Sequence, residues 1–349
     1  MNEFKQKQRN TKIFGRDELN LAADSLKLGE LVAFPTETVF GLGAIANNDH
    51  AVKQVFKTKG RPADNPLIVH VHNIESVYDY VAEVNDVALK LMQTFWPGPL
   101  TIIFPIKEGI FADSVTPNQK TVGIRMPNQL ETLLLIEMAG FPLVGPSANL
   151  SGKPSPTAVE HVINDFDGEI AGVVNNYSEF TQVGVESTVV WPSDHRIDIL
   201  RPGAVTQAML TEATGIETIE KSSEEQISDT TIASPGVKYT HYSPAQPVKM
   251  VQTLTSTEEW KTLIQQMDLK VGILAQDNII SELKSDNIGF SYYSLGSKDE
   301  LEQATQRLFA GLRYLESSEC DIIFAQSFPE TDKTHAYLNR LSKASSSMI

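Results

Sequence analysis

The chain has 349 residues, a length that fits two domains better than a single core. Its formal net charge of −15 argues against a protein that wraps a nucleic-acid backbone, because such proteins need many Lys and Arg contacts. Hydrophobic residues make up 41% of the chain, yet no run reaches the roughly 18 apolar residues of a membrane helix. We therefore expect a two-domain globular protein with no membrane partner.

The chain end and the cysteine content bear on the compartment. Residues 1–12 are polar and basic and lack an apolar stretch, so they do not resemble a secretory signal. The one cysteine, Cys320, cannot form an internal disulfide, and the cytoplasm is the expected location. The apolar neighbours at 322–324 favour a buried, unreactive thiol.

The first half of the chain predicts an α/β domain. Apolar positions 19, 22 and 26 give residues 18–28 the spacing of a helix, which Gly29 would end. A strand at 31–34 ends at Pro35 and places Thr36 and Thr38 at its carboxyl end, where ligands of α/β sheets often bind. Further helices are expected at 51–58 and 87–95, and further strands at 67–71, 100–105, 121–125, 143–144 and 187–191. Because helices alternate with hairpin-length connections, we expect a mixed, twisted sheet.

The second half predicts a linker and a smaller α/β unit. Residues 220–230 are polar and acidic, a composition typical of a linker. Residues 234–244 are unusually aromatic for a tether. The elements expected after it are strands at 271–275, 290–295 and 321–325 and an amphipathic helix at 301–315.

Two short motifs look like parts of one phosphate site. In residues 59–62 (Lys-Gly-Arg-Pro), Arg61 has a planar fork suited to two phosphate oxygens, and Lys59 can add a point charge. In residues 147–149 (Ser-Ala-Asn), backbone amides and two side chains follow a predicted strand and can face a phosphate. Taken singly, the first motif also fits a surface Lys-x-Arg and the second a simple turn.

Other candidate features are weaker on their own. Residues 41–43 (Gly-Leu-Gly) fit a tight turn as well as a ligand loop. His70 closes a predicted buried strand, where a lone histidine is most often structural, and no second histidine lies at metal-ligand spacing. We therefore predict no metal held by the protein itself. The absence of Walker-type and serine-nucleophile motifs leaves catalysis by positioning and charge.

These motifs together resemble the two-domain threonylcarbamoyl-adenylate synthases, whose catalytic part is a YrdC-like domain. The resemblance implies a YrdC-like twisted mixed sheet with helices, plus a smaller Rossmann-like α/β C-terminal domain. The implied boundaries are 13–212 for the catalytic domain, 213–245 for a linker that closes over the active site, and 246–349 for the C-terminal domain.

The same resemblance implies a nucleotidyltransferase that makes threonylcarbamoyl-AMP and pyrophosphate from L-threonine, bicarbonate or CO2, and ATP with Mg2+. The product would serve the threonylcarbamoyladenosine modification of tRNA next to the anticodon. A downstream threonylcarbamoyl-transferase complex would then be a partner, and contact with tRNA itself would be weak or indirect.

Residue roles follow from the resemblance position by position. The catalytic residues implied are Lys59, Arg61, Ser147 and Asn149. The threonine-binding residues implied are Thr36, Thr38, His70, Arg125 and Ser187. The ATP-binding residues implied are Arg61, Asn65, Thr121, Ser147, Ser155, Arg201, Tyr239, His241 and Tyr242. In the expected reaction Arg125 pairs with threonine's carboxylate, and a carbamate formed on threonine's amine attacks the α-phosphate.

Two other functions stay open from the sequence. A non-catalytic RNA-binding module would place the pocket against an RNA end, although the acidic charge disfavours it. A carbamoyl-transfer maturation enzyme also contains a YrdC-like domain, but such enzymes carry zinc-binding cysteine pairs, and this chain has one cysteine.

Overall fold

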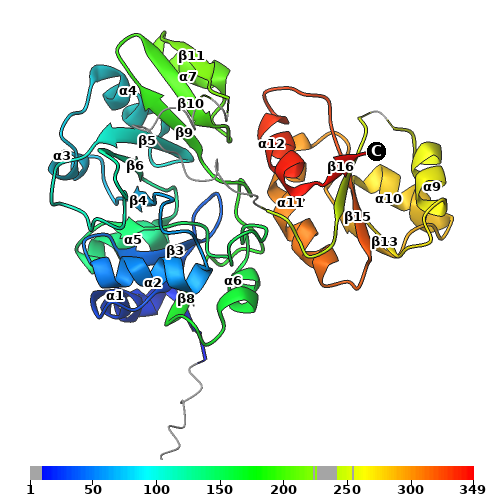
Figure 1. The fold of residues 1–349 in the computed structure, drawn as a ribbon, viewed down its shortest axis with the longest axis horizontal. Helices are drawn as coiled ribbons and strands as arrows, with labels where there is room; N and C mark the ends of the chain where they lie inside the picture. Colours follow the sequence, from blue (N-terminus) through cyan, green and yellow to red (C-terminus); the bar gives the residue numbers. More distant parts are fainter. Residues whose placement is uncertain (1–9, 223–224, 226–241, 254) are drawn as a thin grey trace, which may run out of the picture.

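A computed structural model of the chain describes residues 10–222, 225, 242–253 and 255–349. Two α/β domains lie side by side, a larger one from the N-terminal part of the chain and a smaller one from the C-terminal part (Figure 1). Within the described residues, no helix combines the length and the apolar character needed to span a membrane.

The larger domain is built on a mixed sheet. Its strands are β1 (Lys12–Phe14), β2 (Val32–Phe34), β3 (Gly41–Ile45), β4 (Ile68–His70), β5 (Leu100–Pro105), β6 (Thr121–Arg125), β7 (Leu143–Val144), β8 (Gly172–Val174), β9 (Thr188–Pro192), β10 (Arg196–Arg201) and β11 (Glu217–Glu220). Among the described residues the sheet has eleven strands in the order β1-β8-β2-β3-β7-β4-β6-β5-β9-β10-β11. Strand β4 runs parallel to β6 but antiparallel to β7, and β5 runs parallel to β9 but antiparallel to β6. The expected mixed sheet is therefore confirmed.

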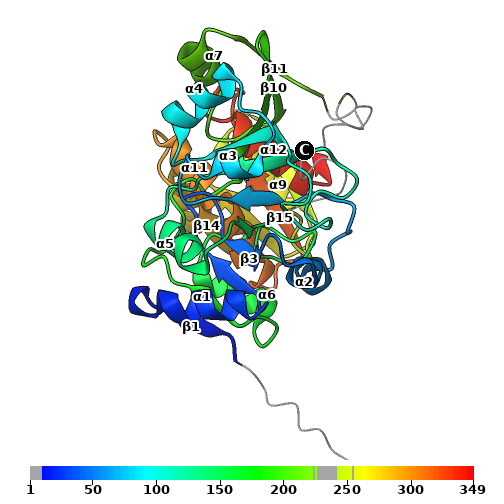
Figure 2. The ribbon, with the colours of Figure 1, turned by 90° about the vertical axis from the view of Figure 1, so that its left-hand side faces the viewer.

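Helices pack around this sheet. They are η1 (Arg16–Glu18), α1 (Leu19–Lys27), α2 (Asp49–Lys59), α3 (Val77–Tyr80), α4 (Asp86–Phe95), α5 (Leu130–Ala139), α6 (Val159–Phe166) and α7 (Gln207–Thr214). Helices α1 and α5 lie together near one end of the domain, and α4 and α7 lie together at the other (Figure 2).

The smaller domain has a parallel sheet, as expected. Its strands are β12 (Val248–Val251), β13 (Val271–Ala275), β14 (Ser291–Ser294), β15 (Ile322–Gln326) and β16 (Ser347–Met348). Its helices are α9 (Thr257–Gln265), α10 (Asp277–Ser285), α11 (Leu301–Glu316) and α12 (His335–Ala344). In the part of the chain that is described, the strand order is β14-β13-β15-β12-β16, and each pair of neighbours is parallel.

Local sequence explains how α2 begins and ends beside the candidate site. The Asn48 side chain accepts a hydrogen bond from the Ala51 backbone amide at 3.1 Å and so caps the first turn. Gly60 ends the helix with a left-handed φ of +60°, a conformation that glycine adopts without steric cost. These two signals fix the point at which Lys59 and Arg61 leave the helix.

Two regions differ from the expectations. Residues 41–43 are part of strand β3 and do not form a tight turn, because β3 pairs with β2 on one side and β7 on the other. The boundary expected at residue 212 falls inside α7, and β11 beyond it pairs with β10, so the larger sheet continues to residue 220. Most of the expected linker, including Tyr239 and His241, lies outside the described residues.

The two domains share one apolar cluster. Val39 and Val185 of the larger domain are buried together with Leu308 and Phe309 of α11. Tyr242 joins the same cluster, and its ring lies 5.1 Å from the Phe309 ring. The C-terminal domain therefore packs against the segments of the larger domain that lead into the candidate site.

Candidate active site

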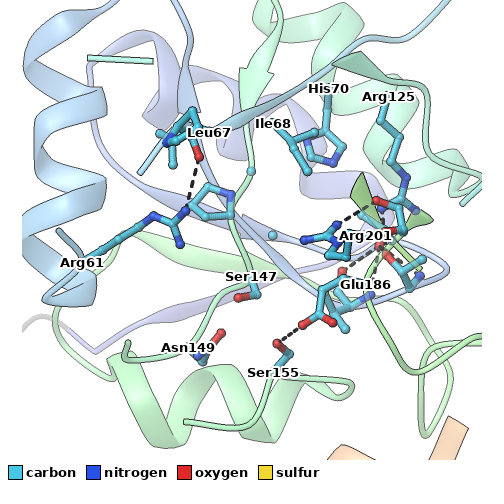
Figure 3. A pocket seen from close by; sticks show the side chains of 18 of the residues that line it. Arg61, Leu67, Ile68, His70, Arg125, Ser147, Asn149, Ser155, Glu186 and Arg201 are labelled. Atoms are coloured by element: carbon cyan, nitrogen blue, oxygen red, sulfur yellow. Dashed lines mark hydrogen bonds between the residues drawn. The ribbon is translucent and has the colours of Figure 1, made fainter. Parts of the chain in front are cut away.

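A cavity of about 690 Å³, which includes the open space at its mouth, collects most of the predicted residues. Figure 3 shows Arg61 on one side of it and Arg201 and Glu186 on the other, with Ser147 and Asn149 between them. The predicted residues among those that line it are Thr36, Thr38, Arg61, His70, Arg125, Ser147, Asn149, Ser155, Ser187, Arg201 and Tyr242.

The charge of the lining is opposite to that of the whole chain. Within the described residues, four cationic side chains line the cavity, and one carboxylate does. The cationic side chains are Arg61, Arg125, Lys153 and Arg201, and the carboxylate is Glu186. A cationic cavity in a protein of net charge −15 favours a polyanionic ligand.

Lys59 and Arg61 take different positions. Arg61 lines the cavity, and one of its guanidinium nitrogens donates to the Pro66 carbonyl at 3.3 Å. Lys59 is 2% exposed, and its ammonium donates to the carbonyls of Ser147 and, at 2.6 Å, Asn149. Burial, together with the nearby Arg61 charge, lowers the pKa of Lys59 well below its usual range. Lys59 thus holds the 147–149 loop from behind. The expectation that its charge would face a phosphate in the cavity is wrong, because Lys59 does not line the cavity.

The 147–149 loop is fixed by the backbone of its neighbours. The Ala148 amide donates to the Phe40 carbonyl at 2.7 Å, and Ser147 forms an isolated bridge with Gly41 of β3. The Asn149 side-chain amide donates to the carbonyls of Leu150 and Lys153 at 2.7 and 2.9 Å. Its buried Oδ1 has no hydrogen-bond partner among the described residues. The loop therefore offers a hydroxyl and an unsatisfied acceptor to the cavity on a rigid backbone.

The threonines after β2 also divide their roles. The Thr36 hydroxyl accepts from the amides of Thr38 and Val39 at 3.1 and 3.2 Å and donates to the Val39 carbonyl at 2.7 Å, so it closes the turn. The Thr38 hydroxyl accepts from Arg125 at 2.8 Å and lines the cavity. Thr36 shapes this part of the wall, and Thr38 presents its side chain to it.

Arg125 is held before any ligand arrives. It is 4% exposed and lies 2.6 Å from the Glu37 carboxylate, a pairing that the sequence did not suggest. Its Nε donates to the Gly98 carbonyl at 3.2 Å. A carboxylate that binds Arg125 would therefore share the guanidinium with Glu37, which offsets part of its charge.

His70 is buried at the end of β4. Its ring packs edge-on against Phe34 at 5.3 Å, and its Nδ1 has no hydrogen-bond partner among the described residues. Burial and the nearby Arg125 charge lower the pKa of His70 to about 3. The imidazole is therefore neutral near pH 7 and can take part in a hydrogen bond without adding charge.

Ser187 and Arg201 form a second polar wall. The Ser187 hydroxyl lies 2.8 Å from the Thr101 hydroxyl, and Arg201 donates to both the hydroxyl and the carbonyl of Ser187 at 3.2 and 3.1 Å. Burial lowers the pKa of Arg201 to about 10, so its guanidinium remains charged near pH 7. This wall joins the start of β9 to the end of β10.

Glu186 is a pocket residue that the sequence analysis missed. One carboxylate oxygen accepts from the Ser155 hydroxyl (Figure 3), and the other accepts from Arg340 at 2.7 Å. Lys153 also lines the cavity and was missed. The only local signal for Glu186 was its position before Ser187, because its charge partner lies in the other domain.

Four more predicted residues are placed differently or cannot be placed. Asn65 is buried and Thr121 begins β6, and neither lines the cavity. Tyr239 and His241 lie outside the described residues, whereas the neighbouring Tyr242 lines the cavity and is buried. In the described parts of the chain, no group of three or more His, Cys, Asp or Glu side chains could hold a metal ion.

Comparison with known families divides the chain into two matches. Residues 24–203 match a family described as "Telomere recombination", and residues 205–346 match one described as "Threonylcarbamoyl-AMP synthase, C-terminal domain". The two matches together cover almost the whole chain.

Individual relatives agree with this division. The chain is 41% identical over 331 residues to the threonylcarbamoyl-AMP synthase of Bacillus subtilis (strain 168), which covers 94% of this chain and 93% of the relative. It is 37% identical over 333 residues to the protein of the same name from Pyrococcus abyssi, covering 94% of each.

Solved structures show the same similarity in three dimensions. The crystal structure of P. abyssi Sua5 complexed with L-threonine superposes with a TM-score of 0.86 at 34% identity, covering 97% of this chain and 100% of that one. With both family matches and near full-length relatives above 30% identity, this chain belongs to the threonylcarbamoyl-AMP synthase family.

Proposed function

We propose that this protein is an L-threonylcarbamoyladenylate synthase, which makes threonylcarbamoyl-AMP and pyrophosphate from L-threonine, CO2 or bicarbonate, and ATP. The observation that carries the proposal is one cavity with two kinds of wall. One wall, with Arg61 and the Ser147 hydroxyl, suits phosphate oxygens, and the unsatisfied Asn149 Oδ1 beside them suits a hydrogen-bond donor of the ligand. The other, with Thr38 and His70, suits a small amino acid with a hydroxyl.

The threonine wall would orient the amine and the carboxylate. Arg125 is proposed to bind the carboxylate, and Thr38, His70 and Ser187 are proposed to satisfy the hydroxyl and amine. His70 stays neutral near pH 7, so it does not repel the positively charged ammonium group of threonine when threonine binds. The ammonium group then loses a proton to solvent and becomes the reactive amine. The amine nitrogen then forms a bond to the carbon of CO2 while one C=O electron pair moves onto oxygen, and the nitrogen releases a second proton to solvent, which gives a carbamate.

The phosphate wall would place ATP for attack by this carbamate. A carbamate oxygen forms a bond to the α-phosphorus while the bond between that phosphorus and the bridging oxygen breaks, and pyrophosphate leaves with that electron pair. Arg61 is proposed to neutralise charge on the leaving phosphates, and Arg201 and Ser155 to contact the nucleotide. No side chain needs to become covalently modified, so positioning and charge supply the catalysis.

Mg2+ belongs to the proposal as an ion that enters with ATP. The carboxylate that lines the cavity, Glu186, already accepts from Ser155 and Arg340. Because this carboxylate already has partners, the cavity fits a Mg2+ ion whose ligands are triphosphate oxygens and water, a common way for Mg2+ to bind beside nucleotides. Such an ion would supply charge neutralisation on the triphosphate.

The cellular setting is also part of the proposal. We propose a cytoplasmic enzyme whose product passes to a threonylcarbamoyl-transferase complex acting on tRNA, with little direct contact between this protein and the tRNA. The net charge of −15 supports weak contact with a polyanion outside the cavity.

The test is pyrophosphate release from ATP in the presence of bicarbonate and different amino acids. Threonine is expected to exceed valine in kcat/KM by on the order of 10⁴-fold, because a site that hydrogen-bonds a hydroxyl rejects an analogue that lacks it. Mass spectrometry would identify the product as threonylcarbamoyl-AMP. Equal pyrophosphate release with threonine and valine, or release without any amino acid, would contradict the proposal.

A further inference from the structure

One side chain of the C-terminal domain reaches the wall of the nucleotide cavity. Arg340 of α12 is fully buried, with 0% exposure. Its Nε donates to a carboxylate oxygen of Glu186 at 2.7 Å, and one terminal nitrogen donates to the backbone carbonyls of Glu186 and Pro202 at 3.3 and 3.0 Å. Its other terminal nitrogen donates to Asn339 at 2.8 Å, which holds it within its own domain.

These contacts lie next to two residues of the cavity. Glu186 precedes Ser187, and Pro202 follows Arg201, so Arg340 ties together the two segments that carry the second polar wall. The segments approach closely, since a Cβ on Gly203 would lie 2.5 Å from the Thr188 backbone nitrogen. A guanidinium that bridges both backbones therefore fixes the spacing between Ser187 and Arg201.

Arg340 also controls the charge of Glu186. Although burial raises the pKa of this carboxyl, the charges of Arg340 and Arg201 outweigh it and lower the pKa to about 2. The other titratable groups around the carboxylate are Tyr242, Lys343 of α12 and Lys59 of α2. Because Arg340 forms its direct ion pair, the cavity meets a neutralised carboxylate and not a free anion.

We propose that Arg340 is a positioning residue for the nucleotide cavity, through which docking of the C-terminal domain sets the affinity for ATP. The inference rests on the proposed function in taking ATP as the ligand. It assigns to the C-terminal domain a direct part in shaping the site. Without Arg340, the buried Glu186 carboxylate would face the triphosphate without its direct ion pair, and the wall at Ser187 and Arg201 would loosen.

A second interdomain ion pair provides a matched control. Arg313 of α11 is buried and donates to Asp165 of the larger domain at 2.8 Å and to the Pro154 carbonyl. Neither Arg313 nor Asp165 lines the cavity. Replacing Arg313 therefore weakens docking of the domains without exposing a charge to the ligand.

The experiment compares ATP binding by calorimetry in the full-length parent, Arg340→Gln and Arg313→Gln, with thermal unfolding to confirm that each variant folds. Arg340→Gln is expected to bind ATP roughly tenfold more weakly than the parent, within the usual range of coupling between sites. Arg313→Gln is expected to keep most of the parent affinity. Equal losses in the two variants would reduce Arg340 to a docking contact and overturn the inference.

The pH dependence of ATP affinity provides a second test of the charge argument. Loss of a contact that only docks the two domains would not change this pH dependence. In Arg340→Gln the Glu186 carboxyl loses its main cation and its pKa should rise, so ATP affinity should recover relative to the parent as the pH falls from about 8 to about 6. Adding Glu186→Gln to Arg340→Gln should restore part of the affinity by removing the unpaired charge. A double variant no better than Arg340→Gln, with no pH effect, would contradict the charge argument.

Two further results need a separate interpretation: a parent protein that does not bind ATP, and an Arg340→Gln variant that does not fold. If the parent itself does not bind ATP, the proposed function fails and not the role of Arg340. If Arg340→Gln does not fold, Arg340→Lys keeps the charge, but its ammonium has three N–H donors and cannot bond to all four oxygens that Arg340 contacts, so it should still weaken ATP binding severalfold. Parent-like affinity in Arg340→Lys would overturn the positioning role.

Discussion

Lys59 and Arg61 lie close together at the end of α2, yet their charged groups contact different parts of the structure. The Lys59 ammonium is bonded to two backbone carbonyls of the 147–149 loop, whereas Arg61 lines the cavity. Of the two, Arg61 is the one whose fork can reach a ligand. Lys59 contributes by holding in place the loop that carries Ser147 and Asn149.

Arg61→Ala is expected to weaken ATP binding tenfold or more. A charge-assisted pair between a guanidinium and a phosphate is worth about 1.5–3 kcal/mol, and alanine removes it. Arg61→Lys should restore only part, because an ammonium cannot contact two oxygens in one plane. Calorimetry measures the affinity, and Lys57→Ala on the exposed face of α2 is the control. Unchanged affinity in Arg61→Ala would remove this residue from the site.

His70 should make the stability depend on pH. Its pKa is about 3 in the folded protein and 6.5 in the unfolded chain. Below pH 6.5, His70 therefore binds a proton in the unfolded chain but stays neutral in the folded protein. The free energy of unfolding decreases as the pH falls from 6.5 toward 3. His70→Gln should lose less stability than the parent between these pH values.

Urea unfolding at about pH 7.5 and about pH 5 measures this effect, since most carboxyls remain ionised at both. His161, whose pKa burial lowers to about 4, adds a background of the same sign in every variant. The control is His195→Gln on the surface, which should follow the parent. If the free energy of unfolding of His70→Gln depends on pH in the same way as that of the parent, His70 is not the cause of this dependence.

At the scale of single elements, β3 shows why its glycines are required. A Cβ on Gly43 would lie 2.6 Å from the Val32 carbonyl oxygen and 2.9 Å from the Phe34 ring. The glycines thus let β3 pair closely with β2 beneath the Phe34 side chain. Their role is in strand packing, which places the Thr36 to Phe40 turn at the cavity.

Gly43→Ala is therefore expected to destabilise the protein by about 1–3 kcal/mol, the usual cost of overpacking a close contact. Gly123→Ala is the matched control within the same sheet, because a Cβ there would meet only side-chain ends at 3.1 Å and beyond. Urea unfolding would give both free energies. A smaller loss for Gly43→Ala than for Gly123→Ala would contradict the backbone contact.

At the scale of the whole molecule, the domain interface reaches the cavity. The shared cluster at Val39, Val185, Tyr242 and Phe309 lies beside the ion pair of Arg340 and Glu186. Tyr242 both lines the cavity and stacks on α11, so one side chain touches the pocket and the C-terminal domain. The closing of the linker over the active site, with Tyr239 and His241, concerns residues outside those described and stays a prediction.

Gly184→Ala should loosen this interface. Gly184 has a φ of +81°, and an added Cβ would collide with the backbone of Gln306 in α11. We expect the variant to lose about 1–3 kcal/mol more than Gly140→Ala, which shares the positive φ but has open space around it. Differential scanning calorimetry measures this loss of stability and also resolves separate unfolding of the two domains. Equal losses in the two variants would place Gly184 outside the interface.

The sequence predicted the elements whose pattern is local. The helices at 18–28, 51–58, 87–95 and 301–315 and most of the strands depend on apolar spacing and on end signals such as Gly29 and Gly60, which act within one turn. The mixed sheet, a second α/β unit and the buried Cys320 followed from the same patterns, whereas the Rossmann-like character of that unit came from the family resemblance. The motifs at 59–62 and 147–149 were also found to meet at one cavity.

Tertiary structure alone decided how the charges of the site are arranged. Glu186 and Arg340 are separated by 154 residues, and Arg125 finds its partner at Glu37 across the sheet. Whether a charged side chain faces a ligand, a carbonyl or another charge depends on which distant segments bury it, and no local pattern encodes that. The sequence by itself therefore determined the family, the fold and the positions of the motifs. The three-dimensional packing decided that Lys59 holds a loop and that Arg340 of the C-terminal domain bonds to the segments that form one wall of the cavity.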